Sequence, residues 1–136
     1  MEKKNIDWSN LSFGYIQTDM RYVSNFKDGA WDEGGLTADA NVVLNECAGV
    51  LQYAQTVFEG LKAYKTPEGR VQLFRPYMNA KRTNNTNDRL CIPQIDEDLF
   101  VDAIKALVDV DQDWIPEGEG TALYIRPFIF GDEPYL

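Results

Sequence analysis

The chain has 136 residues, of which 44% are hydrophobic and 12% aromatic, and this size and composition predict one soluble globular domain. Its formal net charge of −9 disfavours nucleic acid and anionic membranes as partners, because an acidic protein repels both. No stretch approaches the roughly 18 apolar residues of a membrane span, so we expect a cytoplasmic protein without a membrane partner.

The residue types that are absent restrict the possible chemistry. The chain contains no histidine, which excludes Ser-His-Asp and Cys-His nucleophiles and the usual histidine ligands of zinc. Cys47 and Cys91 lie far apart without a CxxC pair, so we predict two reduced, partly buried thiols and no disulfide or metal site. Phosphate loops of the GxxxxGK[ST] and GxGxxG types are also missing. An enzyme made from this sequence would use carboxylates, lysine, tyrosine or a cofactor.

The first sixty residues predict short strands and one helix. The runs LSFGYIQTD (11–19) and MRYVSNFKDGAW (20–31) are rich in β-forming residues, with turn residues at 27–29 and 32–35. After Gly49, apolar residues recur at helical spacing as far as Phe58. We therefore predict a short helix that ends at Gly60, with this glycine as its C-terminal stop.

The rest of the chain gives clearer patterns. Residues 60–76 predict a hairpin, because apolar and polar residues alternate on either side of the Thr66–Gly69 turn. Pro76 opens a helix rich in asparagine and threonine, which propagate a helix poorly, so tertiary contacts must hold it. Asp96 caps an amphipathic helix over 97–110. Residues 121–130 predict a long buried β run, interrupted at Arg126-Pro127.

Arg126 is a charged residue within an apolar strand pattern. A buried charge is costly unless it is paired, so either an internal carboxylate or a bound anion should face it. Tyr124 is two residues earlier and therefore lies on the same face of the strand. Together they could hold a carboxylate, but from the spacing alone we favour a salt bridge between the arginine and one of the 22 acidic residues.

Four other residues are candidates with a structural alternative. Arg82 follows the hairpin on a predicted helix and could contact a phosphate, or it could be an ordinary solvated surface arginine. Tyr53 and Phe58 fit plain core packing, and if both line one cavity, the backbone must leave helical geometry between them. For Glu59 we expect an internal ion pair rather than acid-base catalysis.

Three segments carry a family resemblance. LQYAQTVFEGLKAY (51–64), LFRPYMNAKRTNNT (73–86) and LYIRPFIFGDEPYL (123–136) resemble the branched-chain amino-acid aminotransferases, fold-type IV enzymes that depend on pyridoxal 5'-phosphate. The motifs occur in the order and at the distances typical of the family. The resemblance implies an α+β fold, mostly antiparallel sheet with a few helices, in which residues 1–136 form the small N-terminal domain. This fold agrees with the pattern described above.

The resemblance also implies roles for individual residues. Arg82 matches the arginine that binds the cofactor phosphate. The positions that match the substrate site are Tyr53, Phe58, Gly60, Tyr124, Arg126 and Leu136. Among them, Tyr124 and Arg126 would handle the substrate carboxylate and Gly60 would leave room for the ligand. Tyr53 and Leu136 would reach the pocket of the neighbouring subunit in a homodimer.

The family attaches its cofactor as a Schiff base to a lysine of a second, larger domain. Lys62, Lys65, Lys81 and Lys105 match no such position, so we expect residues 1–136 to be inactive alone. The complete enzyme would transfer amino groups reversibly between leucine, isoleucine or valine and 2-oxoglutarate. The alternatives are another fold-type IV enzyme, such as a D-amino-acid aminotransferase or an aminodeoxychorismate lyase, or a non-catalytic domain that binds a small anion or a protein.

Overall fold

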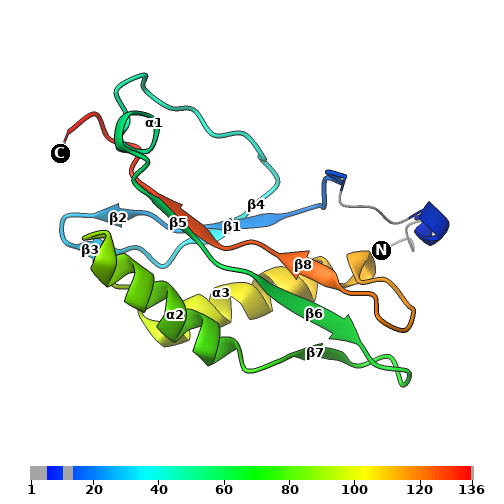
Figure 1. The fold of residues 1–136 in the computed structure, drawn as a ribbon. Helices are drawn as coiled ribbons and strands as arrows, with labels where there is room; N and C mark the ends of the chain where they lie inside the picture. Colours follow the sequence, from blue (N-terminus) through cyan, green and yellow to red (C-terminus); the bar gives the residue numbers. More distant parts are fainter. Residues whose placement is uncertain (1–5, 11–13, 136) are drawn as a thin grey trace.

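The computed structural model describes residues 6–10 and 14–135 (Figure 1). Its strands are β1 (Arg21–Val23), β2 (Phe26–Lys27), β3 (Ala30–Trp31), β4 (Gly35–Thr37), β5 (Thr56–Phe58), β6 (Leu61–Lys65), β7 (Val71–Leu73), β8 (Leu123–Ile125) and β9 (Phe128–Phe130). Its helices are α1 (Gly49–Tyr53), α2 (Pro76–Arg89) and α3 (Glu97–Val110), with 3₁₀ turns at Trp8–Asn10 and Gln112–Trp114. The fold is α+β, as predicted.

All strand pairs within the described ranges are antiparallel. They form a β7-β6-β8 sheet and three two-stranded ladders, β1-β4, β2-β3 and β5-β9. β5 and β6 are consecutive, and their partners β9 and β8 are also consecutive, so the two pairs continue one another in space (Figure 1). The point at which the chain passes from one pair to the other is the Phe58-Glu59-Gly60 segment.

The hydrophobic core lies between the three-stranded sheet and helix α3. Alternation along β6 turns Leu61 and Ala63 towards the core and leaves Lys62 and Tyr64 on the opposite, exposed face. Figure 1 shows α3 passing behind this sheet. The buried core residues are Leu61, Ala63, Ala80, Phe100, Val101, Ile104, Val108, Ile115 and Ile125. The other face of the sheet carries no helix in the parts of the chain that the structure describes.

Two of the predicted elements are confirmed in detail. Asp96 caps α3, because its Oδ1 accepts hydrogen bonds from the amides of Asp98 at 2.9 Å and Leu99 at 3.0 Å. The hairpin pairs β6 with β7 across a tight turn in which the Gly69 amide donates to the Thr66 carbonyl at 2.8 Å. Gly69 has a φ of +81°, a left-handed conformation that favours glycine.

Helix α2 begins at Pro76 as predicted, and tertiary hydrogen bonds hold it. The Asn84 side chain donates to the carbonyl of Ile95 at 2.8 Å and accepts from its amide at 2.9 Å. The buried Asn87 side chain donates to the Pro93 carbonyl at 3.1 Å. The asparagines that weaken the helix locally therefore bind it to the segment that precedes α3.

The helix predicted to end at Gly60 is wrong in its length. It ends at Tyr53, because Ala54 adopts a left-handed conformation with a φ of +53°. Residues 56–58 then extend and pair with β9, from Thr56 opposite Phe130 to Phe58 opposite Phe128. A distant strand thus overrides the local helical spacing.

Two strand predictions also need correction. Residues 14–19 of the first predicted strand contain no strand, because no other described segment forms a β-ladder with them, and residues 11–13 lie outside the described residues. The β run at 121–130 is interrupted at Arg126-Pro127, as predicted, and forms the strands β8 and β9. Its expected burial is wrong, because the run is only partly buried. Proline has no amide hydrogen to donate to a sheet, which explains the break.

The two cysteines lie at the surface. Cys47 and Cys91 are free, as predicted, but both are exposed rather than partly buried, because each lies in a connecting segment outside the core. Within residues 6–10 and 14–135, no helix has the length and apolar character needed to cross a membrane.

Candidate functional site

Phe58, Glu59 and Gly60 form the corner between β5 and β6, and each contacts a different part of the site. The Glu59 amide donates to the Pro127 carbonyl at 2.8 Å, which fixes the corner against the Arg126-Pro127 break of the neighbouring strands. Alternation then sends Phe58 to the exposed face and Glu59 into the interior, where it is 4% exposed. We call these three residues the 58–60 corner.

Arg126 lies on the exposed side of the 58–60 corner. Its guanidinium carbon lies 4.5 Å from the ring centroid of Phe58 and 5.1 Å from that of Tyr124, both cation–π distances. Its Nε and Nη2 donate to the Tyr124 hydroxyl at 3.1 and 2.9 Å. The prediction that Tyr124 and Arg126 share a face is confirmed.

The expected burial of Arg126 is wrong. The side chain is exposed, because β8 ends at Ile125, just before it, and no element of the described residues covers this face of the sheet. No ion pair joins Arg126 to a carboxylate among the described residues, so the predicted internal salt bridge does not occur there. The aromatic rings of Phe58 and Tyr124 contact the cation instead, and they leave it accessible to an anion.

Arg82 lies on the interior side of the same corner. Its Nε donates to Glu59 Oε2 at 2.8 Å, and its Nη2 donates to Glu59 Oε1 in a short charge-assisted hydrogen bond. The predicted internal ion pair of Glu59 is confirmed. Arg82 is not simply solvated, yet its side chain remains 67% exposed, so the part of the guanidinium turned away from Glu59 is open to solvent.

The surroundings of Glu59 favour its charged form. Burial alone would raise its pKa, but hydrogen bonds from Arg82, the Gly60 amide and Asn79, together with the charge of Arg82, lower the pKa below its ordinary value. The same hydrogen bond and charge raise the pKa of Arg82. The pair is therefore ionised near neutral pH.

Gly60 gives space to Tyr124. A Cβ at position 60 would lie 3.1 Å from Tyr124 Cζ and 3.3 Å from Cε2, and closer still to the hydroxyl oxygen. Only a residue without a side chain lets the phenol lie against the backbone here. The room predicted for a ligand at Gly60 is occupied by Tyr124 in this structure, and Tyr124 in turn contacts Arg126.

Tyr53 and Phe58 are both exposed. Tyr53 ends α1 and is 64% exposed, and Phe58 ends β5 and is 66% exposed, so the core-packing interpretation of both is wrong. The backbone does leave helical geometry between them, at Ala54. Leu136 lies outside the described residues.

Sequence reasoning missed Asn79. Its amide donates to the Gly60 carbonyl at 3.2 Å, so α2 holds the 58–60 corner through two side chains. The available signal was spacing: Asn79 and Arg82 are three residues apart and therefore lie on one side of a helix.

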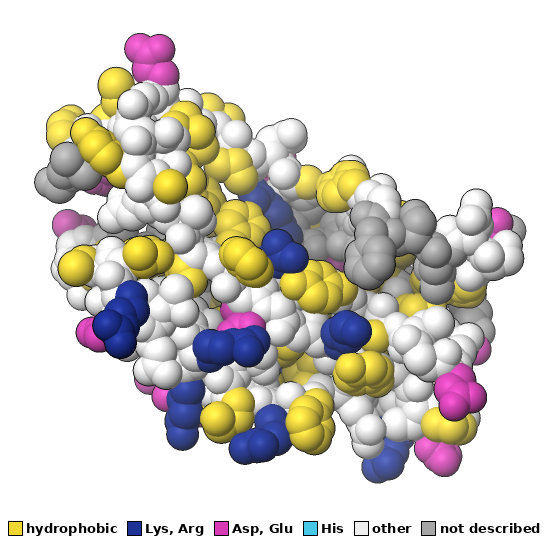
Figure 2. All heavy atoms as spheres, viewed as in Figure 1, with side chains coloured by type: hydrophobic (Ala, Val, Ile, Leu, Met, Phe, Trp, Pro, Cys, Tyr) yellow, Lys and Arg dark blue, Asp and Glu magenta, His cyan; other side chains and the backbone are white. Residues whose placement is uncertain are grey.

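The exposed face combines aromatic and basic side chains. Figure 2 shows that apolar and basic groups share the face formed by β5, β6, β8 and α2, while most of the acidic groups in view lie near its edges. A protein of net charge −9 thus presents a local surface suited to an anion with an apolar part. Among the residues that the structure describes, no carboxylate and thiol groups are clustered so as to hold a metal ion.

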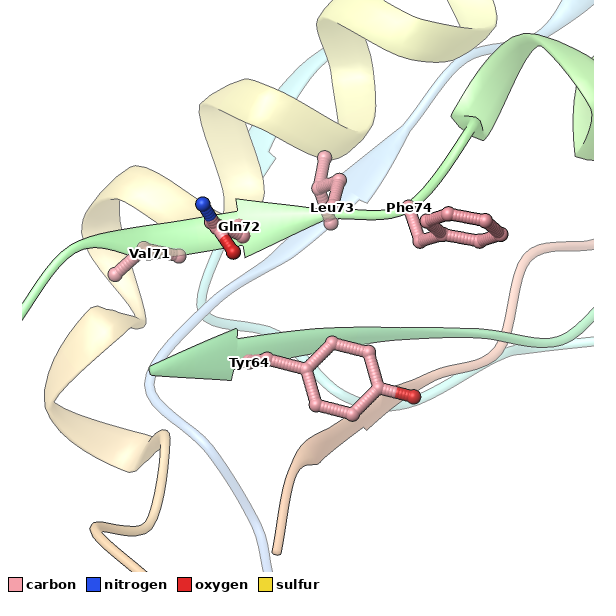
Figure 3. A pocket seen from close by; sticks show the side chains of 5 residues that line it. All are labelled: Tyr64, Val71, Gln72, Leu73 and Phe74. Carbon is pink, nitrogen blue, oxygen red and sulfur yellow. The ribbon is translucent and has the colours of Figure 1, made fainter. Parts of the chain in front are cut away.

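An open hollow of about 750 Å³ lies on the β6-β7 hairpin and was not predicted. Figure 3 shows its lining side chains, which are Tyr64, Val71, Gln72, Leu73 and Phe74. None of them is charged and none is a predicted site residue. The hollow therefore offers no charged partner to an anionic group.

Comparison with solved structures identifies the fold. The T.th. branched-chain amino acid aminotransferase, solved in complex with N-(5'-phosphopyridoxyl)-L-glutamate, superposes with a TM-score of 0.64 and 24% sequence identity. The match covers 88% of this chain and 35% of that protein. The chain therefore has an α+β fold found in the fold-type IV aminotransferases.

Comparison with curated sequences identifies the family. The branched-chain-amino-acid aminotransferase of Haemophilus influenzae is 49% identical over 94% of this chain, and the methionine aminotransferase BCAT4 of Arabidopsis thaliana is 46% identical over 97%. This chain belongs to the branched-chain aminotransferase family. It spans 38% of the length of each of these two relatives. No protein-family model matches the sequence.

Proposed function

We propose that residues 1–136 are the small, substrate-side N-terminal domain of a pyridoxal-phosphate-dependent branched-chain aminotransferase. The observation that carries this proposal is the 58–60 corner, which has an accessible arginine on each side, Arg126 at Phe58 and Arg82 at Glu59. A transaminase of this kind needs one cationic group for the substrate carboxylate and another for the cofactor phosphate. The resemblance of the three motifs assigns these two arginines to those two roles.

Arg82 fits the cofactor phosphate. One side of its guanidinium is held by Glu59, and the remainder of the exposed side chain can donate to phosphate oxygens. Pyridoxal phosphate, when bound, supplies the electron sink that amino transfer requires. The resemblance places the lysine that would carry it outside these residues, since Lys62, Lys65, Lys81 and Lys105 match no such position of the family.

Tyr124 and Arg126 would bind the substrate carboxylate. The arginine offers charge and donors, and the Tyr124 hydroxyl, which accepts from Arg126, still has its own hydrogen to donate. Phe58 would form an apolar wall for the substrate side chain, and Gly60 keeps Tyr124 in place. Because one methylene in an apolar pocket changes binding by only roughly 1–3 kcal/mol, we expect leucine, isoleucine and valine all to be used, with 2-oxoglutarate as the acceptor.

The proposed enzyme is a cytoplasmic homodimer with its sites at the subunit interface. The large exposed side chains Tyr53 and Phe58 support this proposal, since a second subunit would cover them. Tyr53 would reach the partner's substrate pocket, and Leu136 would do the same from the end of this sequence. The methionine aminotransferase relative makes methionine a second candidate amino donor, and the assay below decides between the substrates.

The test uses the complete polypeptide that contains this segment, purified with pyridoxal phosphate. We expect transamination of leucine, isoleucine and valine with 2-oxoglutarate. Arg126→Lys should raise the KM for 2-oxoglutarate by about tenfold or more, because lysine keeps the charge but cannot present the two-pronged donor set. Arg89→Lys, an exposed arginine at the end of α2, should leave KM unchanged and serves as the control.

Two results would overturn the proposal. One is the absence of transamination with any of the branched-chain substrates in the cofactor-loaded protein. The other is equal kinetic behaviour of the Arg126 and Arg89 variants. A preference for methionine over leucine would support transamination as the reaction but would identify methionine as the amino donor.

A further inference from the structure

Glu59 is a buried carboxylate to which the proposed function gives no role. It is 4% exposed, whereas Arg126, Phe58, Tyr124 and Arg82 around it are exposed. A buried charge is costly unless it is well paired, and an uncharged residue would fit an ordinary β corner at a lower desolvation cost. The contacts of Glu59 with Arg82 indicate what it does.

The pairing holds Arg82 in one orientation. Nε and Nη2 donate to different oxygens of the same carboxylate, which fixes both the position and the plane of the guanidinium. Nη1 makes no hydrogen bond within the described residues, and the side chain as a whole is 67% exposed. The donors that remain therefore point away from Glu59 in a fixed direction.

Glu59 is itself fixed by its surroundings. Its Oε1 accepts from the Gly60 amide at 2.7 Å, and its own amide donates to the Pro127 carbonyl at 2.8 Å. Asn79, one turn before Arg82 on α2, donates to the Gly60 carbonyl at 3.2 Å. Glu59 is thus hydrogen-bonded to the strand pairs on one side and to α2 on the other. The orientation of Arg82 therefore depends on the position of the 58–60 corner.

We propose that Glu59 is a positioning residue that orients Arg82 for an anionic phosphate ester. This inference rests on the proposed function, in which Arg82 meets the phosphate of pyridoxal phosphate. Glu59 does not contact the phosphate. It restricts Arg82 to the orientation in which the free donors face the ligand, and so reduces the conformational entropy that Arg82 loses on binding.

The charge of Glu59 and its orienting role predict opposite effects of Glu59→Gln on phosphate binding. Glu59 carries a negative charge close to the proposed phosphate, so if only charge mattered, Glu59→Gln would strengthen the binding of an anion. If orientation dominates, the same substitution weakens binding, because glutamine cannot accept from both Nε and Nη2. The sign of the change therefore decides between the two effects.

The experiment measures the dissociation constants of pyridoxal 5'-phosphate and of pyridoxal, which lacks the phosphate, by absorbance titration of the complete apo-protein. We expect Glu59→Gln to raise the dissociation constant of pyridoxal phosphate on the order of tenfold, which is the scale of one oriented hydrogen bond to a charged group. The dissociation constant of pyridoxal should change by less than about twofold. A purely structural role would weaken both ligands alike. Circular dichroism melting curves report folding of each variant.

Glu59→Asp is the second variant, and it keeps the charge while withdrawing the carboxylate by one methylene. Orientation predicts that it also loses affinity for pyridoxal phosphate, whereas a charge effect predicts wild-type affinity. Tighter binding by Glu59→Gln, or wild-type affinity in both variants, overturns the inference. If the wild type and Arg82→Ala bind the two ligands in the same ratio, then Arg82 does not meet the phosphate, and the proposed cofactor role of Arg82 fails with the inference.

Discussion

Tyr124 is the side chain on which several contacts of the site converge. Its hydroxyl accepts two hydrogen bonds from Arg126, and its ring lies against the Gly60 backbone, where a Cβ would fall 3.1 Å from Cζ. Each residue of the 58–60 corner has a contact of its own: Phe58 contacts Arg126, Glu59 binds Arg82, and Gly60 leaves space for Tyr124. None of these three contacts is required by the core.

Gly60→Ala should impair substrate binding more than folding. The added methyl group forces the Tyr124 phenol aside, and because Tyr124 is 49% exposed, it can move at a stability cost of about 1 kcal/mol or less. The Tyr124–Arg126 contact is then lost, so the KM for 2-oxoglutarate should rise in the complete enzyme while the melting temperature changes little.

Two comparisons test this explanation of Gly60→Ala. Gly35→Ala is the matched control, since a Cβ there meets nothing within 4 Å, and it should alter neither KM nor melting temperature. Gly60→Ala should add little to Tyr124→Phe, because both remove the same contact. Fully additive effects on KM would show that Gly60 acts through another neighbour.

Helix α2 is the element that connects the core to the site. Ala80 and Thr83 face the interior, Arg82 and Asn79 contact the 58–60 corner, and Asn84 is bound to the backbone of Ile95. Its composition is poor for a helix, so these contacts, rather than intrinsic propensity, determine that it forms. A substitution that removes one of these contacts should therefore also disturb the position of Arg82.

Asn84→Ala should lower the free energy of unfolding by about 1–3 kcal/mol. The substitution removes two hydrogen bonds and leaves the amide and carbonyl of Ile95 without their partner in a partly buried position. Asn85→Ala, at an exposed position of the same helix, should change stability by less than about 0.5 kcal/mol. Urea denaturation of both variants measures the difference, and equal stabilities would contradict the assigned role of Asn84.

At the scale of the whole molecule, the core and the proposed substrate-carboxylate contacts occupy opposite faces of the β7-β6-β8 sheet. Leu61, Ala63 and Ile125 pack towards α3, while Lys62 and Tyr124, which are paired across β6 and β8, project from the other face. The core therefore needs nothing from the site face, which remains available for contacts outside this chain. Figure 2 shows the apolar and basic groups on the side of the molecule that bears the proposed site.

The isolated 136-residue polypeptide should have no transaminase activity. It has the proposed phosphate and carboxylate contacts, but none of its lysines matches the cofactor-bearing lysine of the family, and Lys65 and Lys105 are held in ion pairs. The measurement compares the rate with leucine and 2-oxoglutarate against pyridoxal phosphate alone, with the complete enzyme as positive control. A rate above that of free cofactor would contradict the expectation.

The sequence by itself determined the features that depend on neighbours along the chain. Asp96 and its helix, the turn at Gly69 and the shared face of Tyr124 and Arg126 follow from capping, turn chemistry and strand alternation, and all were correctly predicted. An internal ion pair of Glu59 was also expected, and the structure confirms it. The three motifs gave the family.

Only the tertiary structure decided which distant segments meet. The helix before the 58–60 corner ends at Tyr53 because β9, much later in the sequence, pairs with residues 56–58. Arg82 proved to be the partner of Glu59, and Arg126 proved to be exposed between aromatic rings rather than buried. Local periodicity contains no information on strand partners or on which face remains uncovered, because both depend on the packing of segments that are far apart in sequence.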